Sequence, residues 1–252
     1  MKISFRPGRG ENHALTLVET LLVTVTLFIL AAMLLPVTPR IGRAGKVMKA
    51  RTEIADIVNA INAYQTEYGR YPVPTNVEAA ALTGKEDLTF GGPLLNAALG
   101  SGANTSVNAD VITVLMDMTM SPGGTATVNV GHTLNPKQIK FLNAKLSGDN
   151  KSPGVGNDMV YRDPWGNPYI ISMNLNGDGN CRDAFYRSHL VSREKAASGF
   201  GGLSNDSDTN GLSDDFEFHG KVMVWSLGPD GKVDATEPAT AAPNKDNVIS
   251  WQ

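Results

Sequence analysis

The stretch that decides the fold runs from Asn12 to Pro36 and reads NHALTLVETLLVTVTLFILAAMLLP. Between Glu19 and Arg40 no residue is charged, and this span is about the 20 residues that a helix needs to cross a bilayer. Glu19 is the exception near its start, because a carboxylate in a bilayer core costs about 2.5–3.5 kcal/mol. We therefore expect an apolar helix whose acidic side chain needs a partner, and no partner is obvious within the run.

The residues before this run predict its orientation. Lys2, Arg6 and Arg9 precede it, with only Glu11 against them, so the positive-inside rule keeps this leader in the cytoplasm and the remainder outside. A cleaved signal peptide would have a shorter apolar core and an A-x-A-like exit, which the run lacks. A plain single-pass anchor stays open as an alternative, but it gives Glu19 no role.

A second helical pattern follows and ends near residue 70. Its apolar side chains recur at three- and four-residue steps, at Val47, Ala50, Ile54, Ile57, Val58, Ile61, Tyr64 and Tyr68. Gly69 and Pro72 then supply a stop signal. Pro36 and the pair Gly42 and Gly45 are positions where one long helix could kink. The apolar stripe needs cover, which we expect the rest of the chain to supply.

The segment ALTLVE, Ala14 to Glu19, resembles the processing site of type IV prepilins and type II secretion pseudopilins. In that family a short basic leader is cleaved, the new N-terminal residue is methylated, and a Glu stands fifth in the mature chain. The resemblance makes Ala14 the last leader residue, Leu15 the methylated N-terminus and Pro36 the family's helix-kinking proline. Ala14 and Leu15 depart from the usual Gly and Phe of the family.

The same resemblance implies that Glu19 is an assembly residue. Its carboxylate would pair with the positively charged amino terminus of a neighbouring subunit, because a buried charge is tolerated beside an opposite one. The alternative is a Glu near the lipid headgroups that reaches water from the helix end.

Two stretches in the last third also resemble the major pseudopilin of type II secretion. One is DPWGNPY, residues 163–169, inside a predicted strand–turn–strand, and the other pairs VMVWSLGPDG, 222–231, with DNVISW, 246–251. In that family the late loop binds calcium. The residues that the resemblance carries over as ligands are the Leu227 carbonyl, Asp230, Asp246 and Asn247. A solvated acidic hairpin is the alternative for this loop.

A second calcium motif stands without any family. DSDTNGLSDDFE, residues 206–217, matches the complete EF-hand loop pattern D-x-[DN]-x-[DN]-G-x5-E. Its predicted ligands are Asp206, Asp208, Asn210, the Leu212 carbonyl, Asp214 and Glu217. Alternating oxygens wrap the ion, the glycine permits a sharp turn, and the last Glu closes the shell bidentately. Flanking EF helices are not evident, so we expect an isolated loop that binds Ca²⁺.

A third stretch, NLNGDG at residues 174–179, begins the same way with Asn174, Asn176 and Asp178. Its twelfth position is Phe185 instead of Glu, so a polar hairpin turn is the favoured interpretation, although Asp183 could contribute to a site. Calcium would give these loops the constraint that a disulfide cannot, because Cys181 is the single cysteine. Many adhesive type IV pilins clamp this region with two cysteines, which favours the secretion pseudopilin.

These patterns predict an α+β, pilin-like fold in which a long N-terminal helix packs on a small antiparallel sheet with long calcium-binding C-terminal loops. The predicted parts are a cleaved leader at 1–14, a transmembrane half-helix at 15–39, an amphipathic half-helix at 40–70 and a globular domain at 71–252. Residues 73–158 read as an inserted block of short helices and loops, to which the sequence gives no function.

The predicted function is structural. No catalytic constellation appears, and the near-neutral net charge leaves no basic footprint for nucleic acid. We expect a non-enzymatic subunit of a type II secretion pseudopilus, which polymerises through its N-terminal helix to drive protein export across the outer membrane. The expected partners are other copies, minor pseudopilins, the inner-membrane secretion platform and the prepilin peptidase. The expected location is the bacterial inner membrane, single-pass, with the C-terminal domain in the periplasm. A type IV pilus subunit for adhesion, motility or DNA uptake, or a membrane-tethered monomer that binds calcium or carbohydrate, are the alternatives.

Overall fold

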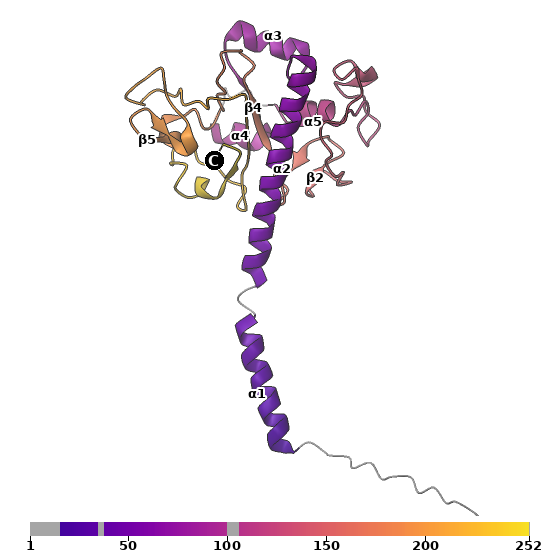
Figure 1. Ribbon diagram of the computed structural model, residues 1–252, viewed down its shortest axis with the longest axis vertical. Helices are drawn as coiled ribbons and strands as arrows, with labels where there is room; N and C mark the ends of the chain where they lie inside the picture. The colour runs from indigo at the N-terminus through magenta and orange to yellow at the C-terminus, as the bar shows by residue number, and fades with distance from the viewer. Residues whose placement is uncertain (1–15, 35–37, 100–105, 252) are drawn as a thin grey trace, which may run out of the picture. The chain divides into compact units, whose positions relative to one another are not determined.

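The computed structural model describes residues 16–34, 38–99 and 106–251 of the 252-residue chain (Figure 1). The chain consists of two compact units, Met1–Ala44 and Gly45–Gln252. The helices are α1 (Leu17–Leu34), α2 (Thr38–Tyr68), α3 (Thr75–Gly84), α4 (Gly92–Leu99), α5 (Ala109–Leu115) and α6 (His189–Ser192). The strands are β1 (Leu88–Phe90), β2 (Gly154–Val155), β3 (Tyr161–Arg162), β4 (Ile170–Met173), β5 (Arg193–Lys195), β6 (Ser198–Gly199), β7 (Val222–Ser226) and β8 (Val248–Ile249). Short 3₁₀ turns are η1 (Val130–His132), η2 (Phe200–Gly202) and η3 (Asn244–Asp246).

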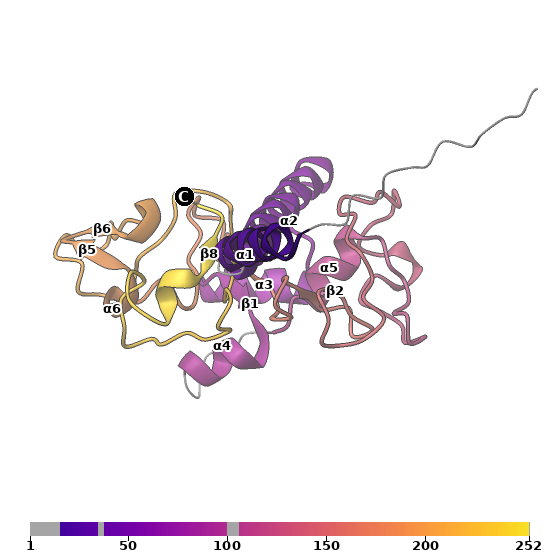
Figure 2. The same cartoon turned by 90° about the horizontal axis from the view of Figure 1, so that it is seen from below.

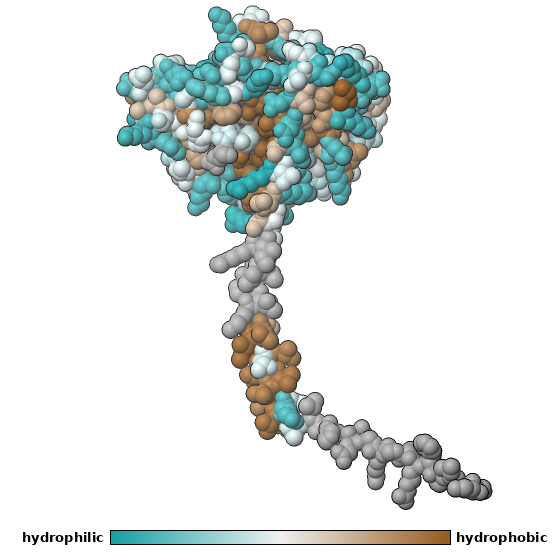
Figure 3. All heavy atoms as spheres, in the orientation of Figure 1, coloured by the Kyte–Doolittle hydropathy of each residue, from teal (hydrophilic) through white to brown (hydrophobic). Residues whose placement is uncertain are grey.

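Helix α1 corrects the membrane prediction. Across the described part of the chain, no helix combines the length and the apolar character that a bilayer crossing requires. The 18 residues of α1 include Glu19 and three threonines, Thr20, Thr24 and Thr26. The predicted transmembrane half of the pilin-like fold and the predicted single-pass location in the inner membrane are therefore wrong. In Figure 3 the described part of α1 is coloured mostly as hydrophobic.

Helix α2 occupies the segment that was predicted as an amphipathic helix, and it ends at Tyr68. Gly69 follows it with a φ of +68°, the left-handed geometry that a glycine stop provides. Its stripe is buried, with Ala50, Ile57, Ile61 and Tyr64 fully inaccessible to solvent. The rest of the chain therefore covers this face, as the apolar pattern required.

The central sheet has four antiparallel strands in the order β1-β4-β7-β8. Ile170 lies opposite Trp225, and Trp225 lies opposite Ile249 across the next pair. The predicted α+β class with a small antiparallel sheet is thus confirmed. The strands come from distant parts of the sequence, so the sheet binds together the segments on both sides of it.

The two faces of this sheet pack into two separate cores. Because successive strand residues point to opposite faces, Ile171 and Val224 join the core under α2, whereas Ile170 and Trp225 join the other core. The second core holds the aromatic side chains of the C-terminal third, namely Phe185, Tyr186, Phe216, Trp225 and Trp251. Figure 2 shows the β5–β6 hairpin at one end of the unit, away from α2.

The block between residues 73 and 158 contributes mainly to the first core, while Leu95 of α4 lies in the second. Leu115 at the end of α5, Leu134 and Leu142 are all buried against the α2 side of the sheet. The ring of Phe141 packs edge-on against Tyr64 of α2, with centroids 5.4 Å apart. This block therefore stabilises the long helix, a role that its loop-like composition did not reveal.

Candidate functional site

Glu19 lies in the first turn of α1 and bonds to its own chain. Its carboxylate accepts hydrogen bonds from the backbone N–H of Thr16 at 2.8 Å and from the Thr16 hydroxyl at 2.9 Å. The Glu19 N–H donates back to the Thr16 hydroxyl at 3.3 Å, which completes a reciprocal capping box. These bonds lower the pKa of the Glu19 carboxyl below its usual value. Thr16 is thus a partner that the apolar run did not suggest.

The other residues of the predicted processing and assembly motif, Ala14, Leu15 and Pro36, lie outside the described residues.

Around Glu19, α1 exposes large apolar side chains. Leu17 is 82% exposed and Phe28 is 76% exposed. Large exposed apolar surfaces are typical of interaction sites in proteins.

The loop at 206–217 brings together a group that could hold a metal ion. One ligand atom each from Asp206, Glu217 and His219 lies within 4.8 Å of the other two. His219 Nε2 is 3.0 Å from Asp206 Oδ2. The first and last positions of the EF-hand pattern are therefore adjacent, as the pattern predicts.

Backbone constraints fold the loop so that its ends meet. Asp208 accepts hydrogen bonds from the N–H groups of Asn210, Leu212 and Ser213, which lower the pKa of its carboxyl. Gly211 has a φ of +63°, and a Cβ there would lie 1.8 Å from the carbonyl oxygen of Ala196. Only glycine fits this position.

The other two acids among the predicted ligands, Asp208 and Asp214, are not in the group. Asp208 is occupied by its own turn, and Asp214 accepts hydrogen bonds from the backbone N–H of His189 and lies 2.7 Å from His189 Nδ1. Asn210 and Leu212 are exposed. The EF-hand pattern thus predicted two members of this group, Asp206 and Glu217, and two further acids that lie outside it.

His219 is the member of this group that the sequence pattern missed. It stands two residues after Glu217, in a segment that pairs with Cys181 through Phe218. Alternate residues of an extended segment share a face, so this i, i+2 spacing was the available signal. The His219 side chain also lies 2.8 Å from the Ser204 hydroxyl.

The donor set does not by itself choose the metal. Calcium takes oxygen ligands only, whereas zinc and related ions accept imidazole together with carboxylates. Glu217 is 8% exposed and already accepts hydrogen bonds from Asn180 at 2.7 Å and from Arg182 at 3.1 Å. These second partners hold the carboxylate in place and would orient it toward a bound ion.

The second predicted calcium loop is formed by two segments, residues 222–231 and 246–251. The β7–β8 register carries Gly228 against Asp246, so close that a Cβ on Gly228 would lie 2.2 Å from the Asp246 carbonyl oxygen. Leu227 is buried, while Asp230 is exposed and accepts a hydrogen bond from the Lys232 N–H. The structure therefore brings the two segments together.

In the same loop, Asn247 donates from Nδ2 to the Tyr186 hydroxyl at 3.0 Å. Its Oδ1 is buried and accepts no hydrogen bond from the described residues. A buried amide oxygen without a donor is costly. A bound molecule or ion that contacts this oxygen would remove that cost.

The weaker third stretch forms a polar turn. Asn174 accepts from the Gly177 N–H, Asn176 from the Asp178 N–H and Asp178 from the Asn180 N–H. Asp183, which the sequence offered as a contributor, is fully buried elsewhere and accepts hydrogen bonds from Ser172 and Trp225. Cys181 is also fully buried, and burial raises the pKa of its thiol, which disfavours the nucleophilic thiolate.

The chain matches no protein-family model, no curated protein and no solved structure. The functional conclusions below therefore depend on the residues and geometry described above.

Proposed function

We propose that the chain is a filament subunit of the type II secretion pseudopilus kind, which assembles by packing its α1 against α1 of other copies. One observation carries the proposal: the large apolar side chains of α1 are exposed on every side of the helix. They are Leu17, Val18, Leu21, Leu22, Val23, Val25, Leu27, Phe28, Ile29 and Leu30. One partner helix would cover a single stripe, so an all-round apolar surface favours several neighbours, as in a fibre.

The chemistry of Glu19 is compatible with this arrangement. A carboxylate enclosed by apolar neighbours needs a positive partner. If cleavage follows Ala14, the new amino group belongs to Leu15, the residue before Thr16. The N–H of Thr16 donates a hydrogen bond to the Glu19 carboxylate. A neighbour's amino group would then compete for the same carboxylate and set the register between copies.

The test is assembly of the full-length protein, followed by sedimentation and negative-stain electron microscopy. Phe28→Ser should abolish filaments, whereas Leu82→Ser should not, because Leu82 is a comparably exposed apolar residue on α3. Glu19→Gln should reduce assembly, and Glu78→Gln, an acid in the first turn of α3, should leave it unchanged. Filaments that survive Phe28→Ser would refute the proposal. Deleting the gene separates the uses of the fibre: protein secretion fails for a pseudopilus, and motility or adhesion fails for a type IV pilus.

For the 206–217 loop we propose calcium as the bound ion. Asp206 and Glu217 supply hard carboxylate oxygens at the first and twelfth loop positions, which suits calcium. In that case His219 would not be a ligand of the ion. Calorimetry on the purified chain tests the choice. Calcium binding should persist in His219→Ala and be lost in Glu217→Gln. Zinc binding that is tighter than calcium binding and depends on His219 would overturn the assignment.

A further inference from the structure

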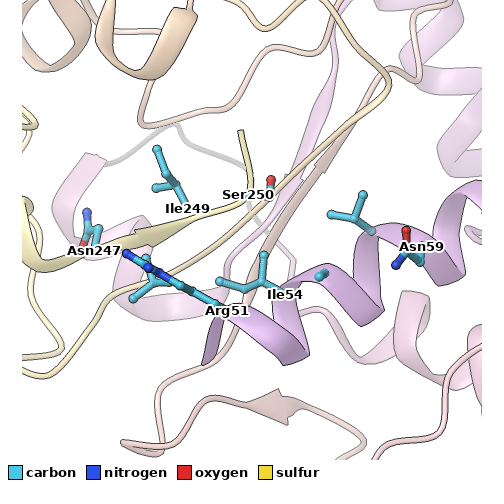
Figure 4. Close-up of a pocket in the computed structure, with 9 residues that line it drawn as sticks. Arg51, Ile54, Asn59, Asn247, Ile249 and Ser250 are labelled. Atoms are coloured by element: carbon cyan, nitrogen blue, oxygen red, sulfur yellow. The ribbon is translucent and has the colours of Figure 1, made fainter. Parts of the chain in front are cut away.

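A groove with a volume of about 430 Å³ lies between α2 and the C-terminal segment, inside the unit Gly45–Gln252 (Figure 4). Its lining residues are Arg51, Ile54, Ala55, Val58, Asn59, Asn247, Val248, Ile249 and Ser250. The aliphatic side chains on both walls make it suitable for an apolar side chain of modest size.

Two polar groups of the groove lack a partner within the described part of the chain. Arg51 is exposed and forms no ion pair there, and the buried Oδ1 of Asn247 accepts no hydrogen bond. Figure 4 shows Arg51 reaching from α2 toward Asn247. The groove thus combines an apolar floor with a free cation and a free acceptor, which suits an occupant with an apolar tip, a carboxylate and an N–H group.

The loop at 206–217 presents the apolar tip and the carboxylates of that combination. It holds five acids and no Lys or Arg. Leu212 is 57% exposed in this loop, and the Asp214 side chain two residues later is 59% exposed. The part of α2 beside the groove has the opposite charge, because residues 45–52 contain Lys46, Lys49 and Arg51 and no acid.

The loop belongs to a different surface of the same unit. It follows Ser204, which bridges to Ser198 of the β5–β6 hairpin, and this hairpin lies at the end of the unit away from α2 (Figure 2). A contact between a groove and a loop on different surfaces is heterologous, and repeating it generates an open array instead of a closed dimer.

We propose that in the filament Leu212 of one copy inserts into the groove between α2 and β8 of the next copy, where Arg51 pairs with the carboxylates beside Leu212. This contact rests on the proposed filament function and names a second interface of it, separate from the packing of α1. The apolar tip fills the groove, and the charges of the two surfaces fix its orientation.

Cysteine cross-linking of the full-length chain during assembly tests the contact. The double variant Ala55→Cys/Leu212→Cys, treated with a short bis-maleimide, should give a ladder of covalent multimers on a denaturing gel. Mixing the two single variants should give dimers only. The control Ala55→Cys/Thr83→Cys, with an exposed position on α3, should give no ladder. The native Cys181 can stay, because it is fully buried.

A charge reversal adds a second readout. Arg51→Glu should raise the concentration needed for assembly by about tenfold, because it sets like charges against each other, and Lys195→Glu, on exposed β5, should not. If filaments form but the ladder is absent and Arg51→Glu assembles like the wild type, this contact is wrong and the filament function stands. If the wild-type chain forms no filaments, both proposals fall.

Discussion

The Ser226 hydroxyl donates a 2.6 Å hydrogen bond to Asp163 Oδ2, which ties the turn before β4 to the last residue of β7. The other oxygen of Asp163 accepts the N–H groups of Trp165 and Asn167. All of these bonds are made by one carboxylate that is fully inaccessible to solvent. The DPWGNPY stretch is therefore a turn whose aspartate fastens it to the neighbouring strand.

Asp163→Ala should destabilise the protein by about 3 kcal/mol, because it leaves the Ser226 hydroxyl and two N–H groups in a buried place without their acceptor. Urea unfolding followed by tryptophan fluorescence measures the loss. Asp230→Ala removes an exposed carboxylate with one turn bond and should cost about 0.5 kcal/mol or less. Equal losses in the two variants would contradict this account of the turn.

Asp87 should make stability depend on pH. Its carboxylate accepts the N–H groups of Leu175, Asn176 and Arg182, and burial raises its pKa from 3.8 to about 6. Because the folded-state pKa lies above the unfolded one, this contribution to stability is fully present below about pH 4 and is lost as the pH rises through 6. The loss is on the order of 3 kcal/mol.

Urea midpoints measured between pH 4 and 7 test this dependence. Asp87→Asn cannot titrate, so its midpoint should fall less steeply over this range than that of the wild type. Glu237→Gln, which changes an exposed carboxyl, should retain the wild-type slope. Parallel curves for the wild type and Asp87→Asn would show that the group does not act in this way.

Removal of divalent metal should lower the melting temperature. A ligand at a hundred times its dissociation constant stabilises the folded state by about 2.7 kcal/mol, which corresponds to about 5–10 °C for a domain of this size. Calorimetric scans with and without a chelator measure the shift. Asp206→Asn should melt at one temperature under both conditions, and a chelator effect that persists in this variant would place the ion elsewhere.

Gly211→Ala should prevent the 206–217 loop from closing. The residue needs a positive φ, and the added Cβ would collide with the Ala196 carbonyl. Gly124→Ala is the matched control, since Gly124 has a φ of +81° and no atom lies within 4 Å of the place that its new Cβ would take. Both variants carry the left-handed strain of about 1 kcal/mol, but only Gly211→Ala should also lose metal binding in calorimetry. Retained binding would show that the loop adapts.

The parts of the fold that the sequence predicted are those set by local periodicity. The stripe from Val47 to Tyr68 and the stop at Gly69 follow from side-chain spacing along one helix, so they could be read directly. The membrane prediction rested on the charge-free run between Glu19 and Arg40, but no helix among the described residues has the length and apolar character of a membrane span.

The candidate site was predictable only in outline. The positions of Asp206 and Glu217 follow from the loop pattern, but the addition of His219 depends on how the segment after the loop pairs with Cys181. Asp208 matched the pattern equally well, yet its oxygens are used by the turn. These turn bonds become visible only when the loop is folded.

The shared sheet has a consequence for how the chain reaches its native state. β4 and β7 contribute alternate side chains to both cores, and β8 completes the edge of the sheet about 200 residues after α2 begins. Neither core can mature alone, because the strands that close one of them also close the other. The chain must therefore be synthesised as far as Val248 of β8 before the core under α2 is complete.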